Sequence, residues 1–91
     1  MKKVVLLGST GSVGTSTCKV AEDLSDEIQL IGLAAGRNVS LLRKQVEQFN
    51  PKVVSLSDPD AASELANEYN GSPDVLHGDK GLLRLATLPE A

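Results

Sequence analysis

The fold is decided by a stretch near the N-terminus, VVLLGSTGSVG, residues 4–14. Its first four residues form a continuous apolar run, which is typical of a strand buried on both faces of a parallel sheet. Glycines then recur at positions 8, 11 and 14, and apolar residues return at helical spacing over residues 12–24. The stretch therefore predicts a strand, a glycine turn and a helix in direct succession.

Strands and helices are expected to alternate along the rest of the chain. Asn38, Asp58 and Asp79 are candidate N-caps of the later helices, and Asn70 with Gly71 closes the third. This alternation predicts an α/β fold, a Rossmann-like parallel sheet with helices on both faces. The remaining elements are strands at 28–35, 52–56 and 74–76, and helices at 39–49, 59–69 and 79–86.

With 91 residues, the chain is expected to be the truncated first half of a doubly wound domain. We expect residues 1–91 to be the N-terminal part of a nucleotide-binding domain, without the catalytic and C-terminal domains of its parent. The predicted strand order is third, second, first, with residues 74–76 outside the third strand. Residues 4–7 would then form an apolar edge, through which we expect the isolated chain to associate.

The composition excludes several classes of function. Nine basic and twelve acidic residues give a net charge of −3, and the aromatic content is only 2%. Both values argue against a nucleic-acid partner. No apolar run approaches the ~20 residues of a membrane helix, and the run at 4–7 is too short for a signal peptide. With a single cysteine, which fits a reducing compartment, we expect a cytoplasmic protein that binds neither nucleic acid nor membrane.

The three glycines predict a nucleotide site at the end of the first strand. Gly8 allows a tight turn, Gly11 lets the backbone approach a pyrophosphate, and Gly14 lets the helix pack closely on the strand. The spacing departs from the commoner G-x-G-x-x-G pattern because Ser9 stands at the second glycine position. The alternative is that these are turn glycines without a ligand.

The helix that follows the turn supplies the attraction for phosphate. The N-terminus of the helix at 12–24 offers N–H groups without helical partners and the positive end of the dipole. The hydroxyls of Thr10 and Ser12 add donors. A P-loop is excluded because Thr15 stands where that motif needs a lysine.

The end of the second strand determines the kind of cofactor. An NAD-binding fold usually has a carboxylate there, but this chain has AAGRN, residues 34–38. Arg37 is the type of residue that pairs with a 2′-phosphate, and Gly36 lets the backbone come near it. The helix at 39–49 also directs its N-terminus at that anion. We therefore expect NADPH rather than NADH, with a solvated surface arginine as the alternative.

Other reactive residues are not expected to act in catalysis or metal binding. Cys18 has no local base and is interpreted as a small helix residue. His77 stands alone at a strand end and is interpreted as a turn residue. A further acidic group is interpreted as a solvated helix face: Asp58, Asp60, Glu64 and Glu68.

Four segments together resemble a known family: GSTGSVG, AAGRNVSLL, FNPKVVSL and PDVLHGDKGLLRLATLPEA. The chain is similar over essentially its whole length to the N-terminal segment of the 1-deoxy-D-xylulose 5-phosphate reductoisomerase family. The enzymes of that family are NADPH-dependent oxidoreductases that also use Mg²⁺ or Mn²⁺. They convert 1-deoxy-D-xylulose 5-phosphate to 2-C-methyl-D-erythritol 4-phosphate in non-mevalonate isoprenoid biosynthesis.

The resemblance implies two groups of cofactor-binding residues and a homodimeric parent enzyme. It implies no catalytic or metal-binding residue within this chain, so residues 1–91 alone are expected to be inactive. The pyrophosphate side of NADPH would contact Thr10, Gly11, Ser12 and Val13, and the 2′-phosphate would contact Gly36, Arg37 and Asn38.

The sequence is also consistent with two other interpretations of the glycine turn. One is another NADP-dependent reductase, of the semialdehyde dehydrogenase type, which would have a catalytic cysteine further along the chain. The other is a stand-alone nucleotide-binding module without catalysis.

Overall fold

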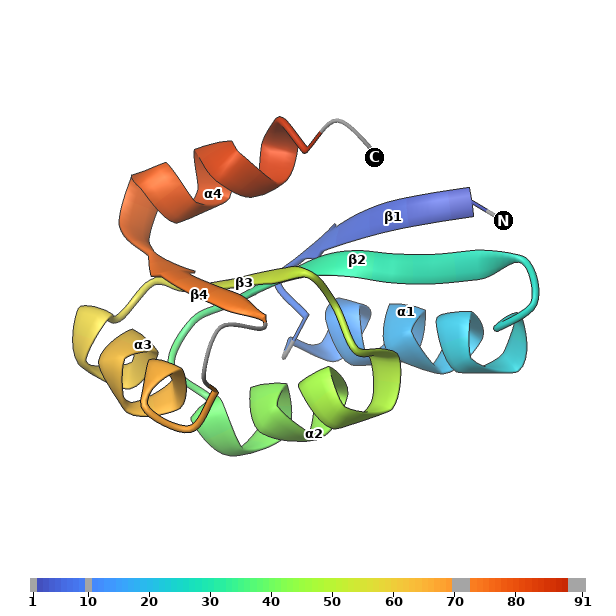
Figure 1. Cartoon of the computed structure of the whole chain (residues 1–91). Helices are drawn as coiled ribbons and strands as arrows, with labels where there is room; N and C mark the ends of the chain where they lie inside the picture. Colours follow the sequence, from blue (N-terminus) through green and yellow to red (C-terminus); the bar gives the residue numbers. More distant parts are fainter. Residues whose placement is uncertain (1, 10, 70–72, 89–91) are drawn as a thin grey trace.

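A computed structural model describes residues 2–9, 11–69 and 73–88. Within these ranges, parallel strands and helices alternate along the chain (Figure 1). The strands are β1 (Lys2–Leu7), β2 (Ile28–Ala35), β3 (Val53–Leu56) and β4 (Asp74–His77). The helices are α1 (Ser12–Asp23), α2 (Val39–Phe49), α3 (Pro59–Ala66) and α4 (Gly78–Ala86).

The strands lie in the order β1-β2-β3-β4, and each neighbouring pair is parallel. This confirms the predicted order, with the fourth strand outside the third. Figure 1 shows α1, α2 and α3 on one face of the sheet and α4 on the other, so the prediction of helices on both faces is also confirmed. Because all strands run the same way, the turns that follow them meet at one edge of the sheet.

The core has two parts, one on each face of the sheet. The larger part lies under α1, α2 and α3 and includes the fully buried Leu33, Leu42 and Leu65. The smaller part lies under α4 and centres on Leu85. Gly32 on β2 allows α4 to approach, because a β-carbon there would lie 2.5 Å from Cδ2 of Leu85.

Two of the predicted N-caps are confirmed. Oδ1 of Asn38 accepts from the backbone N–H of Leu41 at 3.1 Å, which begins α2. Oδ1 of Asp58 accepts from the N–H of Asp60 at 3.0 Å, which begins α3. Helix α3 ends at Ala66, so it is shorter than the apolar spacing predicts. The predicted closing pair, residues 70 and 71, lies outside the described residues.

The prediction that Asp79 caps the last helix is wrong. Helix α4 begins at Gly78, its N-cap is His77, and Asp79 lies in its first turn. The reason is that β4 runs to His77 and the chain turns at once into the helix through Gly78, whose φ is +68°. A left-handed residue of this kind lets a strand pass into a helix without a capping side chain.

The edge strand β1 is better protected than the sequence predicts. It begins at Lys2, because Lys2 pairs with Ile28, and its pairing register shifts between Val4 and Val5. Charged residues and irregular register both discourage edge-to-edge pairing. Among the described residues β1 pairs with β2 alone, so it remains an edge strand, and Leu7 at its end is 58% exposed.

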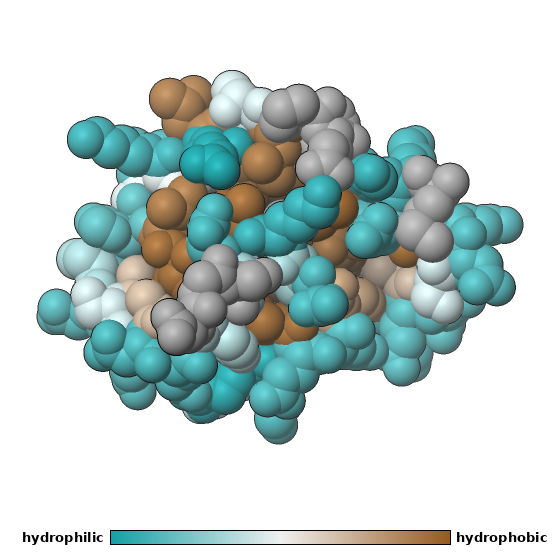
Figure 2. Space-filling view, in the orientation of Figure 1, coloured by the Kyte–Doolittle hydropathy of each residue, from teal (hydrophilic) through white to brown (hydrophobic). Residues whose placement is uncertain are grey.

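Figure 2 shows that apolar surface gathers in the middle of the face in view, between α4 and the helices on the other side of the sheet. Polar side chains surround it. No helix in the described part of the chain is long and apolar enough to cross a bilayer.

Candidate functional site

The turn between β1 and α1 is held by close backbone contacts. Gly8 has a φ of +72°, in the left-handed region that favours glycine. A β-carbon on Gly14 would overlap the carbonyl oxygen of Gly8 and lie 2.8 Å from the carbonyl carbon of Ser9. Helix α1 therefore packs directly against the turn, which is the role that the sequence predicts for Gly14.

Gly11 is the N-cap of α1 and is exposed. Its backbone is extended (φ −78°, ψ 174°), and it has no side chain to accept from the first-turn amides. The first N–H groups of an α-helix lack partners within the helix, which makes such a terminus a candidate anion site. The N–H of Gly11 itself donates to the carbonyl oxygen of Gly8 at 3.1 Å. Ser12 and Val13 contribute backbone to this first turn, whereas Thr10 lies outside the described residues.

The segment between β2 and α2 presents a cation beside a second helix N-terminus. Gly36, Arg37 and Asn38 are all exposed, and 86% of the Arg37 side chain is open to solvent. Asn38 caps α2 through its side-chain oxygen. The end of β2 carries no carboxylate, as its residues are Ala34 and Ala35.

The structure adds a carboxylate to this region that sequence reasoning missed. Oδ2 of Asp58 lies 3.9 Å from Nε of Arg37, while the other oxygen of the same carboxylate caps α3. Asp58 follows β3, the neighbour of β2 in the sheet. The predicted strand order could have indicated this meeting, because the carboxyl ends of adjacent parallel strands lie side by side.

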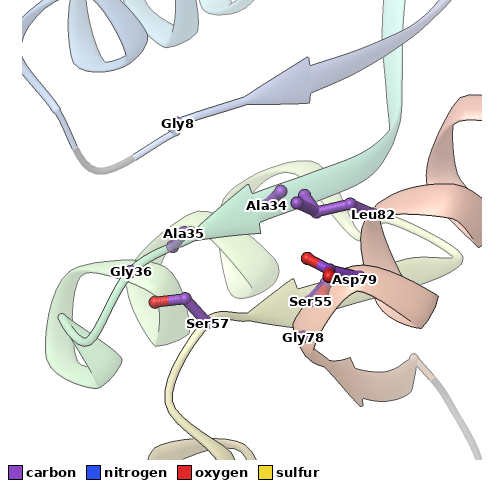
Figure 3. Close-up of a pocket in the computed structure, with 9 residues that line it drawn as sticks. All are labelled: Gly8, Ala34, Ala35, Gly36, Ser55, Ser57, Gly78, Asp79 and Leu82. Carbon is purple, nitrogen blue, oxygen red and sulfur yellow. The ribbon is translucent and has the colours of Figure 1, made fainter.

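A cavity of about 330 Å³ opens at this edge of the sheet, bordered by the turns after β1, β2 and β3 and by the start of α4. Figure 3 shows its polar side chains, Ser55, Ser57 and Asp79, with Ser57 near Gly36. Gly8 and Gly36 thus border one space, but of the predicted cofactor-binding residues only Gly36 is among the described residues that line it. The full lining is Gly8, Ala34, Ala35, Gly36, Ser55, Ser57, Gly78, Asp79 and Leu82.

A second missed residue, Gln45, reaches the glycine turn from α2. Its side chain is only 4% exposed, and its Nε2 donates to the carbonyl oxygen of Ser9 at 2.7 Å. The signal in the sequence is a polar residue on the apolar face of the helix at 39–49, next to Leu42 and Val46. Such a residue needs a hydrogen-bond partner when it is buried.

Neither Cys18 nor His77 is among the described residues that line the cavity. Cys18 is buried on α1, and desolvation raises the pKa of its thiol, which disfavours the nucleophilic thiolate. His77 is exposed at the end of β4. Among the described residues, no three histidine, cysteine, aspartate or glutamate side chains are grouped so that they could hold a metal ion.

Comparison with known proteins gives a consistent result. A family model described as 1-deoxy-D-xylulose 5-phosphate reductoisomerase matches residues 4–91. The protein of that name from Thermoanaerobacter sp. (strain X514) is 46% identical over 82 residues, which cover 90% of this chain and 22% of the relative. The chain spans between 22% and 24% of the length of such curated relatives.

Solved structures of proteins with the same name are also similar to this chain. The reductoisomerase from Zymomonas mobilis, in complex with NADPH, is 32% identical with a TM-score of 0.87, covering 98% of this chain and 24% of that one. A DOX-P reductoisomerase in complex with NADPH, fosmidomycin and magnesium is 27% identical with a TM-score of 0.86. This match covers 94% of this chain and 22% of the other.

Proposed function

Because the chain belongs to the 1-deoxy-D-xylulose 5-phosphate reductoisomerase family, we propose that it binds NADPH as the N-terminal part of such an enzyme. The observation that carries this proposal is the exposed guanidinium of Arg37, which stands at the end of β2 where NAD-binding folds usually carry a carboxylate. A 2′-phosphate distinguishes NADPH from NADH, and arginine recognises phosphate through a planar set of donors.

The surroundings of the site fit the two anionic parts of this dinucleotide. Gly11, the N-cap of α1, is exposed, and the N-terminus of α2 lies next to Arg37. Each attracts negative charge through its N–H groups and dipole. We assign the pyrophosphate to Thr10, Gly11, Ser12 and Val13, and the 2′-phosphate to Gly36, Arg37 and Asn38.

The proposed activity belongs to the full-length enzyme, which would convert 1-deoxy-D-xylulose 5-phosphate to 2-C-methyl-D-erythritol 4-phosphate. NADPH supplies a hydride when it is bound. This chain's residues would bind and orient the cofactor, while the catalytic groups and the ligands of Mg²⁺ or Mn²⁺ would come from outside residues 1–91. We therefore expect no turnover from the 91-residue chain alone.

Reversing the charge at Arg37 tests the proposal. Arg37→Asp in the full-length enzyme should weaken NADPH binding at least about tenfold, because a charge-assisted hydrogen bond contributes ~1.5–3 kcal/mol. Asp58 would then face a second carboxylate. The affinity for NADH should stay the same or improve, because a carboxylate can accept from the ribose hydroxyls. Calorimetric titration with both cofactors measures the two affinities.

A matched control for this variant is Arg84→Asp on α4. Arg84 is also an exposed arginine with a long ion pair, 3.8 Å from Asp74, and the charge change is identical. It should leave NADPH affinity within about twofold, since an exposed charge outside the site is screened. Equal losses in the two variants, or none at Arg37, would contradict the assignment.

For the assembly, we propose a cytoplasmic homodimeric parent enzyme. For residues 1–91 alone we predict association through the open edge of β1, where Val4 to Leu7 carry no charge and Leu7 is exposed. Sedimentation of the purified chain at micromolar concentration should show a mass that rises with concentration. A monomer at every concentration, with slowly exchanging amides in β1, would rule this out.

A further inference from the structure

We infer that Gln45 is a positioning residue, which fixes the glycine turn relative to the segment that carries Arg37. This inference rests on the proposed binding of NADPH. Gln45 lies on α2, the helix whose N-terminus follows Gly36, Arg37 and Asn38. Its side chain bonds across to Ser9 in the turn before α1. One helix therefore links the two segments that would hold the two phosphate-bearing parts of a single ligand, its pyrophosphate and its 2′-phosphate.

The backbone of Ser9 is held on both sides. Its N–H donates to the carbonyl oxygen of Ala34 at 2.8 Å, which extends the pairing of β1 with β2. Its carbonyl oxygen accepts from Nε2 of Gln45 at 2.7 Å, and Ser9 is fully buried. The bond to Gln45 is thus the contact that ties this carbonyl to α2.

The other polar atom of the Gln45 side chain shows that a glutamine at this position has a cost for stability. Its Oε1 is buried and has no hydrogen-bond partner among the described residues, and the same holds for the hydroxyl of Ser9. A buried polar atom without a partner costs stability. An apolar side chain of similar volume would avoid that cost at Oε1 but would leave the buried carbonyl oxygen of Ser9 without this donor. What Gln45 adds over such a side chain is the donor to the turn.

The test uses two ligands that differ in how much of the site they span. NADPH would occupy both segments, whereas adenosine 2′-monophosphate would reach only the Gly36–Asn38 end. Gln45→Met in the full-length enzyme keeps the length of the side chain and removes the donor. We expect the Kd for NADPH to rise about tenfold, because a displaced binding group loses its contact with the ligand. The Kd for adenosine 2′-monophosphate should stay within about twofold.

The matched control is Gln48→Met, an exposed glutamine on the same helix, which should change neither Kd. If the Met variant does not fold, Gln45→Asn gives the same comparison, since its amide is one methylene too short to reach Ser9. Equal changes for the two ligands, or an unchanged Kd for NADPH, would overturn the inference. A wild-type enzyme that binds no NADPH would instead refute the proposed function.

Discussion

Gly14→Ala is expected to destabilise the protein by at least about 3 kcal/mol, the upper end of what overpacking usually costs. Helix propensity alone would predict the opposite change in stability, since alanine normally stabilises a helix by ~1 kcal/mol relative to glycine. The reason is the contact between α1 and the turn: the added β-carbon would overlap the carbonyl oxygen of Gly8. That oxygen belongs to the backbone and cannot rotate away, so the helix or the turn must move. Denaturant unfolding of the full-length protein measures the loss.

Gly11→Ala is the control for this prediction. A β-carbon on Gly11 would lie 3.5 Å from the same carbonyl oxygen of Gly8, which is an ordinary contact, and its extended backbone accepts any side chain. We expect a loss of no more than about 1 kcal/mol, from the poorer N-cap. A Gly14→Ala protein as stable as the wild type would show that α1 does not sit so closely on the turn.

Gly11→Val is expected to abolish NADPH binding while the fold is kept, with an affinity loss of about a hundredfold or more. A β-carbon on Gly11 would make only an ordinary contact among the described residues, and Gly11 is the N-cap of α1. A branched side chain there would occupy the space into which a pyrophosphate must come to reach the first-turn N–H groups. Calorimetry gives the affinity, and circular dichroism checks the fold.

The result for Gly11→Val shows whether Gly11 is needed for ligand binding or for folding. If Gly11→Val still binds NADPH at nearly normal affinity, the phosphates lie elsewhere. If it fails to fold, the space in front of α1 is needed by the protein and not by a ligand. Together with Gly14→Ala, it tests whether one glycine serves packing and the other serves binding.

Much of the fold could be predicted because local signals agreed with the final packing. Strand β2 and helix α2 have the predicted bounds, since a mostly apolar run, IQLIGLAA, marks the strand and a capping Asn38 marks the helix. The predictions failed where long-range contacts decide the bounds. Lys2 and Lys3 belong to β1 only because they pair with Ile28 and Gln29, and polarity alone does not reveal such pairing.

Some residues of the candidate site could likewise be predicted from the sequence, and others could not. Gly8, Gly14 and Arg37 could be identified as candidates from spacing along the chain, because each lies within one strand–turn–helix unit. Asp58 and Gln45 could not be found from spacing alone, since each meets a segment more than twenty residues away, at Arg37 and at Ser9. Their roles depend on strand order and on which face of α2 is buried, and both are properties of the assembled sheet.

A crystal structure of the full-length protein with NADPH bound would test the proposed cofactor site directly. We predict the 2′-phosphate within hydrogen-bond distance of the Arg37 guanidinium and the pyrophosphate against the N-terminus of α1. A cofactor bound with its 2′-phosphate away from residues 36–38, or with its pyrophosphate away from the glycine turn, would contradict this prediction.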